Sequence, residues 1–260
     1  MAYTEVSFED ASDIVTAAGL PNLAKFEKLP GGWANSNYKL SLDDDTQVVL
    51  KIWNEQTLDE VEYLLSITSY LSNNGVPTPR PIQFTNGDFI FMKNGLPWTL
   101  IPFIKGSWLN PNQSSLYSLG KIQANLHLIN PPNTLKSQFS MGYSLFEKLF
   151  AIAEENDEWT DFILMLKSES FRLKEKIGDL PKGVIHGDLF PDNMIGTDDE
   201  VVSLLDFEEV CYGILSFDLV MTFVGCCWDN GEPIAERWDA LLSGYPVSYT
   251  HLRAHETDSY

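Results

Sequence analysis

The sequence has few cysteines and few basic residues for its 260-residue length. Cys211, Cys226 and Cys227 are its three cysteines, and they form neither a metal-binding spacing nor a C-x-x-C redox motif. Without a framework of disulfide bonds, a reducing compartment, the cytoplasm, is expected. The 17 basic residues face 37 acidic ones, for a net charge of −20, which argues against nucleic acid or an anionic membrane as a partner.

Long apolar runs are also missing. No stretch approaches the roughly 20 residues of a membrane helix, and the N-terminus lacks the basic segment and apolar core of a signal peptide. The nucleotide-binding motif G-x-x-x-x-G-K-[ST] is absent as well. Hydrophobic residues nevertheless make up 44% and aromatic residues 12%, enough for one large globular domain or two lobes with a sizeable core.

The most informative stretch is Val184–Asp206, which reads V-I-H-G-D-L-F-P-D-N-M-I-G-T-D-D-E-V-V-S-L-L-D. A short β-branched strand leads into a polar loop that contains Gly and Pro. Two apolar runs then flank the acidic turn at residues 197–200, which predicts a hairpin. Asp206 follows the end of this hairpin.

Three side chains of this stretch suit metal-assisted phosphoryl transfer. Asp188 can accept the proton of an attacking hydroxyl, and Asn193 and Asp206 can offer oxygen ligands to Mg²⁺. The spacing H-x-D-x-x-x-x-N, followed by an apolar strand and Asp-Phe, is the kinase catalytic-loop pattern with its metal-binding aspartate. We expect His186 to fix the loop by hydrogen bonding and not to act as the base. The alternative, an acidic surface hairpin with a structural histidine, is disfavoured by the complete string.

The string I-H-G-D-L-F-P-D-N, followed by L-L-D-F-E and G-I-L-S-F-D-L, resembles the aminoglycoside phosphotransferase and choline kinase superfamily. Within it, the chain is most similar to homoserine kinase type II and its relatives, from about Leu29 to about Trp228. The resemblance implies an α+β, two-lobed protein-kinase-like fold with ATP between the lobes and Mg²⁺ as the second cofactor. Residues 1–103 are then an ATP-binding lobe with a five-stranded antiparallel sheet, and residues 104–246 a mainly helical catalytic lobe.

The resemblance also implies residues that bind the nucleotide. Asn35 and Ser36 follow a Gly-containing loop that lies over the ATP phosphates in such proteins. Lys51 stands in a β-branched strand and is expected on the α- and β-phosphates, held by a helix glutamate. We choose Glu62 as that partner, with Glu60 as the rival because it also suits a helix-capping role.

Three further expectations come from the same likeness. The backbone at Pro102, Phe103 and Ile104 is the expected hinge against which adenine binds. Asp218 is expected to orient the catalytic loop. His127 is interpreted as a buried structural histidine on a helix beneath that loop.

Hydrophobic periodicity and turn residues predict the remaining elements. Asn86-Gly87 and Asn94-Gly95 are hairpin signals. Ser7 with Asp10 and Thr57 with Glu60 are helix-capping pairs. Helices are expected at about 7–19, 58–72, 114–129, 144–155, 158–177, from 215 onward and at 233–243, and strands at 25–29, 38–42, 47–53 and 97–103.

The last 14 residues, 247–260, have no clear period. They resemble a read-through translation of sequencing-adapter DNA and are interpreted as a non-native tail. Members of the resembled family continue with further helices, so a C-terminally truncated chain is expected.

The predicted reaction transfers the γ-phosphoryl group of ATP to a hydroxyl of a small amine-bearing acceptor, homoserine-like in the first instance. Choline, ethanolamine, hydroxylysine or an aminoglycoside are alternative acceptors on the same fold. A protein kinase is disfavoured because no Ala-Pro-Glu segment and no room for an activation loop follow Asp206. A non-catalytic nucleotide-binding fragment is the remaining alternative; the presence of Lys51, Asp188, Asn193 and Asp206 argues against it.

Overall fold

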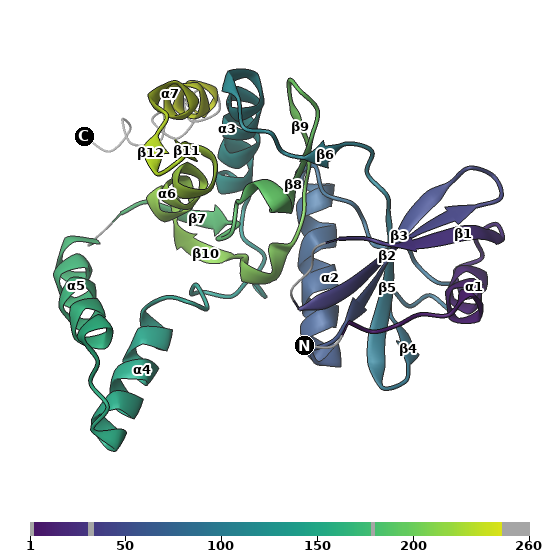
Figure 1. Ribbon diagram of the computed structural model, residues 1–260, viewed down its shortest axis with the longest axis horizontal. Coiled ribbons are helices and arrows are strands. Elements are labelled where there is room, and N and C mark those ends of the chain that lie inside the picture. The colour runs from purple at the N-terminus through teal and green to yellow at the C-terminus, as the bar shows by residue number, and fades with distance from the viewer. Residues whose placement is uncertain (1–2, 31–33, 178–179, 246–260) are drawn as a thin grey trace. The chain divides into compact units, whose positions relative to one another are not determined.

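The computed structural model describes residues 3–30, 34–177 and 180–245 (Figure 1). The chain divides into two compact units. The N-terminal unit runs to Trp108 and also includes Ile195–Thr197 and Val201–Leu205; the C-terminal unit holds the remainder from Leu109 onward. The sequence predicted a boundary after residue 103 and gave no sign that two short later segments belong to the first unit. The tail at 247–260 lies outside the described residues.

A five-stranded antiparallel sheet in the order β1-β2-β3-β5-β4 forms the base of the N-terminal unit, as predicted. Asn94-Gly95 makes the predicted hairpin turn, and both residues have positive φ (53° and 77°), which suits Asn and Gly. The strands are β1 (Leu23–Lys28), β2 (Asn35–Leu42), β3 (Gln47–Trp53), β4 (Phe91–Lys93) and β5 (Leu96–Pro102).

The hairpin predicted at Asn86-Gly87 is only partly correct. The chain does turn there, with the Phe84 amide donating to the Asp88 oxygen at 2.8 Å. Residues 77–84, all described, form no strand. The three prolines lie in the segment 76–81, which the sequence predicts as an extended connector. The β-like run expected before the turn is residues 82–85, and Pro81, directly before it, has no amide hydrogen to donate to a ladder.

The two helices of the N-terminal unit cover opposite faces of this sheet. On one face, Leu40, Leu50 and Leu100 share a buried core with Ile14 of α1 (Phe8–Ala17). On the other, α2 (Leu58–Asn73) packs against Trp53. Both helices begin with the predicted capping boxes, Ser7 with Asp10 and Thr57 with Glu60. Such caps each stabilise a helix by about 1 kcal/mol.

The hairpin predicted after the polar loop is confirmed. It consists of β8 (Met194–Gly196) and β9 (Val201–Leu204), which form a three-stranded sheet with β6 (Ser107–Trp108). β6 pairs antiparallel to β8, with Ser107 opposite Gly196. The β9 amide of Leu204 donates to the Pro77 oxygen at 2.7 Å, which ties the hairpin to the N-terminal unit.

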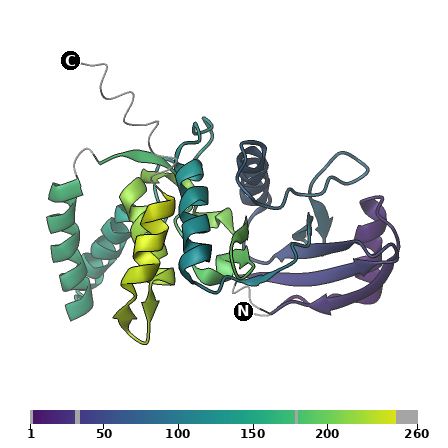
Figure 2. The same cartoon turned by 90° about the horizontal axis from the view of Figure 1, so that it is seen from above.

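Helices dominate the C-terminal unit, as predicted. α3 and α7 lie side by side, and α4 and α5 form a second pair (Figures 1 and 2). The helices are α3 (Gln113–His127), α4 (Tyr143–Asn156), α5 (Asp161–Ile177), α6 (Leu215–Cys226) and α7 (Ala235–Gly244). The strands are β7 (Lys182–Ile185), which pairs with β10 (Cys211–Ile214), and β11 (Trp228–Asp229), which pairs with β12 (Glu232–Pro233); η1 (Pro191–Asn193) and η2 (Phe207–Glu209) are single 3₁₀ turns.

Two predicted helices begin later than expected. The helix expected from residue 158 begins at Asp161, because Asp157 is left-handed and the Thr160 hydroxyl accepts the Ile163 amide at 3.2 Å. The helix expected from residue 233 begins at Ala235, because Glu232–Pro233 pairs in a short hairpin. Side-chain capping and local pairing, not hydrophobic period, decide both starts.

The contact between α3 and α7 depends on two glycines. A Cβ atom at Gly120 would lie 2.1 Å from the Leu241 oxygen, and one at Gly244 would lie 2.1 Å from the Tyr117 oxygen. Only glycine permits so close an approach. The approach brings Tyr245, directly after α7, to the end of α3. No helix in the described ranges is both long and apolar enough to pass through a membrane.

Candidate active site

The predicted catalytic loop, residues 186–193, follows β7 and holds Asp188 in a fixed position. η1 begins at Pro191 and brings the Asn193 side chain back to Asp188. The Asn193 Nδ2 donates to the Asp188 backbone oxygen at 2.9 Å and to its carboxylate Oδ2 at 2.8 Å. Because Nδ2 uses both of its hydrogens here, the amide orientation is settled and Oδ1 remains as the acceptor oxygen of Asn193.

The pKa of Asp188 is raised above its ordinary value. Burial is the main cause; the electrostatic interaction with His186 and the hydrogen bond from Asn193 oppose it, and the nearby Asp206 and Asp192 add to the rise. A carboxylate with a raised pKa is a stronger base than an exposed one. The position therefore suits a group that accepts or orients a hydroxyl proton.

His186 is fully buried and contacts the loop itself. Its Nδ1 accepts the Asp188 amide at 3.3 Å, and its ring centroid lies 4.5 Å from that of Phe207. Since Nδ1 accepts an N–H, the neutral ring carries its proton on Nε2. These contacts fit the loop-fixing role predicted for His186.

Asp206 is exposed at the end of the hairpin and has a left-handed backbone (φ 59°, ψ 67°), a conformation that Asp tolerates better than most residues. The described residues contain no group of three or more His, Cys, Asp or Glu side chains that could hold a metal ion. Asn193 Oδ1 and the Asp206 carboxylate are the two oxygen ligands predicted from the sequence, and their metal role stays a prediction. This set fits Mg²⁺, which binds through few protein ligands and otherwise through water and phosphate oxygens.

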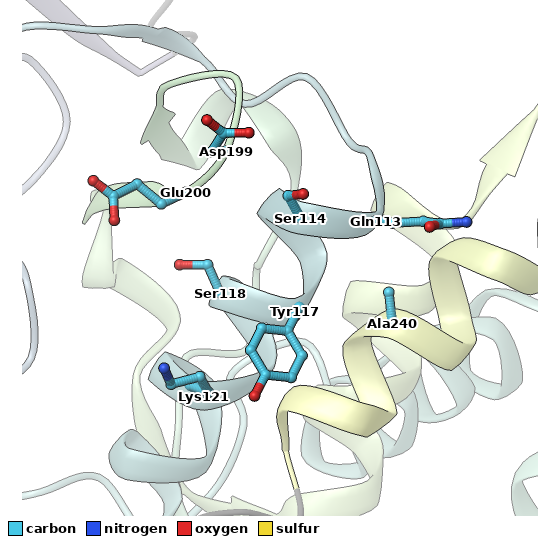
Figure 3. Close-up of a pocket in the computed structure, with 8 residues that line it drawn as sticks. All are labelled: Gln113, Ser114, Tyr117, Ser118, Lys121, Asp199, Glu200 and Ala240. Atoms are coloured by element: carbon cyan, nitrogen blue, oxygen red, sulfur yellow. The ribbon is translucent and has the colours of Figure 1, made fainter.

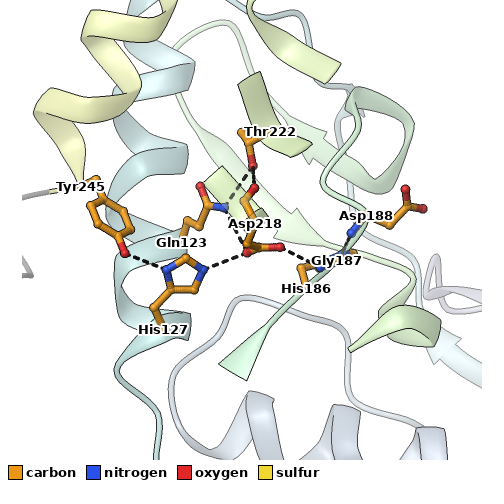
Figure 4. A network of polar contacts seen from close by, with 8 residues as sticks. All are labelled: Gln123, His127, His186, Gly187, Asp188, Asp218, Thr222 and Tyr245. Atoms are coloured by element: carbon orange, nitrogen blue, oxygen red, sulfur yellow. Dashed lines mark hydrogen bonds and ion pairs between the residues drawn. The ribbon is translucent and has the colours of Figure 1, made fainter. Parts of the chain in front are cut away.

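A buried polar network lies beneath the loop (Figure 4). Asp218, in the first turn of α6, accepts the Gly187 amide on Oδ1 at 2.7 Å. Its Oδ2 accepts Gln123 Nε2 at 3.0 Å and contacts His127 Nε2 at 2.8 Å. The contact of Asp218 with the loop fits its predicted orienting role, and the predicted burial of His127 is confirmed.

Hydrogen bonding controls the protonation of Asp218. Burial alone would raise its pKa, but the hydrogen bonds from His127, Gln123 and Gly187 outweigh burial and hold the pKa below its ordinary value. The carboxylate is therefore ionised at neutral pH. An ionised Asp218 selects the His127 tautomer with a proton on Nε2, so Nδ1 accepts the Tyr245 hydroxyl at 2.7 Å.

Sequence reasoning missed three members of this network: Gln123, Thr222 and Tyr245. Gln123 donates to the Thr222 hydroxyl at 3.0 Å as well as to Asp218. The available signal was spacing, since Gln123 and His127, like Asp218 and Thr222, are four residues apart on one helix and so share a face. Tyr245 gave no local signal.

The predicted nucleotide-binding residues lie in the N-terminal unit. Lys51 is central in β3, opposite Asn37 of β2 and Thr99 of β5, and its Nζ lies 3.9 Å from the Trp53 ring centroid, a favourable cation–π geometry. Glu60 is engaged in the capping box with Thr57. The pairing of Lys51 with Glu62 stays a prediction.

Asn35 and Ser36 begin β2, and both side chains are buried. Ser36 Oγ accepts hydrogen bonds from the Thr4 amide at 2.8 Å and from Asn54 Nδ2 at 2.9 Å. Both contacts use the hydroxyl as an acceptor, so a contribution of the Ser36 side chain to phosphate binding would come from its own O–H. That contribution, like that of Asn35, stays a prediction.

The expected hinge residues lie at the end of β5. Pro102 has no amide hydrogen, and the Phe103 amide donates to the Gln47 oxygen at 3.0 Å. A hydrogen bond from this hinge backbone to adenine would thus come from the Ile104 amide. The hinge role itself stays a prediction.

A surface pocket of about 490 Å³ lies within the C-terminal unit, lined by α3, the turn after β8 and α7 (Figure 3). Its wall includes the Tyr117 ring and the opposite charges of Lys121 and Glu200. None of the predicted site residues lines it. The chemistry of the catalytic loop, not the volume of this pocket, therefore defines the candidate site.

The three cysteines are buried, and their pKa values are raised by burial, to about 12 for Cys211 and Cys226 and about 11 for Cys227. We expect native thiols to react with Ellman's reagent at pH 8 at least about a hundredfold more slowly than exposed cysteine, because so little thiolate is present. Unfolding in urea should expose all three thiols and let them react as fast as exposed cysteine. Fast reaction of any thiol in the native protein would contradict the burial of that residue.

The chain is similar in sequence to homoserine kinases over nearly its whole length. The homoserine kinase of Nitrobacter winogradskyi is 27% identical over 251 residues, covering 94% of this chain and 76% of the relative. That of Rhizobium rhizogenes is 28% identical over 272 residues, covering 98% and 82%. Both similarities extend through the two units.

Solved structures with this fold include spectinomycin phosphotransferase in complex with ADP and spectinomycin, with a TM-score of 0.71 at 15% identity, covering 93% of this chain and 80% of that one. Plasmodium vivax ethanolamine kinase has a TM-score of 0.63 at 17% identity, covering 88% and 69%. An antiparallel sheet unit joined to a helical unit with this catalytic loop is a kinase-like phosphotransferase. The chain belongs to the phosphotransferase enzyme family, which matches residues 25–251. It is an ATP-dependent phosphotransferase with an alcohol group as acceptor.

Proposed function

We propose that this protein transfers the γ-phosphoryl group of ATP to the hydroxyl of a small amine-bearing acceptor, homoserine or a close analogue, in the cytoplasm. The observation that carries the proposal is the Asp188–Asn193 contact, which fixes a carboxylate of raised pKa beside a metal-binding amide oxygen. The similarity to homoserine kinases over 94% of the chain supports the acceptor class. The acidic net charge of −20 suits a cationic group on the acceptor.

Each site residue then has a separate task. Asp188 orients the acceptor hydroxyl and takes its proton, and His186 keeps Asp188 in place through the loop backbone. Asn193 and Asp206 hold Mg²⁺, which supplies charge neutralisation to the phosphate oxygens when bound. Lys51, in the N-terminal unit, binds the α- and β-phosphates.

The assignment is tested by measuring ADP release from ATP with a panel of acceptors: homoserine, choline, ethanolamine, hydroxylysine and an aminoglycoside. Homoserine should give the highest kcat/KM. If kcat/KM is at least tenfold higher for another acceptor, that acceptor becomes the proposed substrate and the proposed reaction type is unchanged. No transfer to any acceptor, with ATP still bound, would favour the non-catalytic alternative.

Replacing Asp206 with alanine should weaken Mg²⁺-dependent ATP binding about ten- to a hundredfold, the range seen when groups that support a metal site are removed. Calorimetric titration of ATP with and without Mg²⁺ measures it. Asp192→Ala is the matched control, because Asp192 is an exposed acid of the same loop with no proposed ligand role. Equal affinity of the Asp206→Ala and unmodified proteins for MgATP would remove Asp206 from the metal site.

A further inference from the structure

The extended segment Tyr3–Val6, here called the N-terminal strap, lies against the start of β2. The Tyr3 hydroxyl donates to the Asn37 backbone oxygen, and the Asn37 amide donates to the same hydroxyl at 2.8 Å. One side chain therefore binds both polar backbone groups of Asn37. The strap thus extends the hydrogen bonding of β2 beyond its partner strands.

Thr4 closes a small ring of hydrogen bonds beside this contact. Its amide donates to Ser36 Oγ at 2.8 Å, and its Oγ1 donates to Asn54 Oδ1 at 2.6 Å. Asn54 Nδ2 completes the ring by donating to Ser36 Oγ at 2.9 Å. The ring fixes the chain before α1, the first residues of β2 and the residue after β3 relative to one another.

Packing anchors the strap at both ends. The Tyr3 ring meets the buried Tyr38 ring edge-on, with centroids 5.5 Å apart, and Lys28 Nζ lies 3.4 Å from the Tyr3 ring centroid. The Tyr38 hydroxyl donates to the Thr4 oxygen at 2.8 Å. Val6 is buried in the core shared by the sheet and α1. The strap is an ordered part of the N-terminal unit.

The register of the sheet connects the strap to the phosphate-binding residues. Asn37 is the direct partner of Lys51, and Ser36 is the partner of Ile52. The strap therefore holds β2 at the point opposite the lysine. We propose that Tyr3 and Thr4 are positioning residues that hold the backbone of residues 35–37 for the ATP phosphates. This inference rests on the proposed function, in which Lys51 binds those phosphates, and on the phosphate-binding role predicted for Asn35 and Ser36.

The full chain carrying Tyr3→Phe or Thr4→Val tests the inference. Each change removes a hydroxyl and leaves the shape of the side chain nearly unchanged. We expect the dissociation constant of MgATP, measured by calorimetry, to rise about three- to tenfold for each variant, the range set by one or two lost hydrogen bonds. Thr4→Ser keeps the hydroxyl and should restore affinity to within about twofold of the unmodified protein.

Ser7→Ala is the matched control for stability. It removes the α1 cap just beyond the strap and should lower the melting temperature without changing the MgATP dissociation constant. Hydrogen exchange of the Asn37 amide gives a second readout that needs no nucleotide, and Tyr3→Phe should speed this exchange at least tenfold. A merely structural role would change melting temperature alone.

Three outcomes would overturn the inference: unchanged affinity despite faster Asn37 exchange, unchanged exchange in Tyr3→Phe, or weakened MgATP binding in Ser7→Ala equal to that in Tyr3→Phe. Failure of the proposed function is a separate result. The unmodified chain would then transfer phosphate to no acceptor or bind no MgATP, whatever the Asn37 exchange rate. If the unmodified chain binds MgATP and both Tyr3→Phe and Thr4→Val bind it equally well, only the positioning role of the strap is ruled out.

Discussion

Asp188→Asn is expected to lower kcat about 10²–10⁴-fold, the usual contribution of a general base or hydroxyl-orienting group. Asparagine can keep the contact with Asn193 through its amide oxygen, so the loop should stay folded. It cannot accept the hydroxyl proton. The dissociation constant of MgATP should stay within a few-fold, because the predicted nucleotide contacts belong to other residues. Turnover within a few-fold of the unmodified enzyme would remove Asp188 from the mechanism.

The pH dependence gives a second test of the same residue. A base must be ionised to work, so kcat falls as the pH drops through the pKa of Asp188. Because burial raises that pKa, the loss should begin at a higher pH than the ordinary aspartate value of about 3.9 implies. Asp192→Asn removes one of the charges that raise the pKa and should move the acid limb to lower pH with kcat retained. If the acid side of the kcat–pH profile does not move, the loss of kcat reports the titration of another group.

Asp218→Ala is expected to destabilise the protein by about 3–5 kcal/mol, because it leaves the donors of Gly187, Gln123 and His127 buried without their acceptor. This is a large part of the total stability of a typical domain, about 5–15 kcal/mol. Urea unfolding measures the loss. Ser216→Ala, an exposed change in the same turn of α6, should stay within about 0.5 kcal/mol.

Asp218→Asn separates hydrogen bonding from charge. The asparagine oxygen can still accept the Gly187 amide, and its amide can donate to His127 if the ring moves its proton to Nδ1 and donates to Tyr245. The loss should therefore be smaller than for alanine. Since the folded pKa of Asp218 is lowered, its charge stabilises the fold fully above the unfolded pKa of about 3.9. That advantage over Asp218→Asn should vanish as the pH falls through the folded value. A constant difference down to pH 2 would contradict the ionised state.

Local patterns were enough to predict much of this fold. The capping pairs at Ser7 and Thr57 and the Asn94-Gly95 turn each act through a few neighbouring residues, so their sequence signals hold in the structure. The turn at Asn86-Gly87 shows the limit: the β-like run before it, residues 82–85, forms no strand although its pattern predicted one. The start of α5 at Asp161 was not predicted, because it is set by the Thr160 hydroxyl that caps the helix and not by the charged residues before it.

The candidate site was predictable only where its residues are close in the chain. Asp188, Asn193 and Asp206 lie within one stretch, and the loop pattern identified them. Gln123, Thr222 and Tyr245 meet through contacts about a hundred residues apart in sequence, and such contacts leave little trace in the local pattern around each residue. The strap was missed for the same reason, since Tyr3 and Asn37 belong to different elements.

The N-terminal unit is not continuous in sequence, because Ile195–Thr197 and Val201–Leu205 belong to it although about ninety residues of the other unit come first. During synthesis, at about 5–20 residues per second, the first 108 residues leave the ribosome before their last strands exist. The backbone groups of β6 therefore have no β8 partner for several seconds after they are synthesised. The N-terminal unit therefore completes its fold only after residues 109–194 are synthesised, and neither a single proteolytic cut nor a simple gene truncation can separate an intact N-terminal unit from this chain.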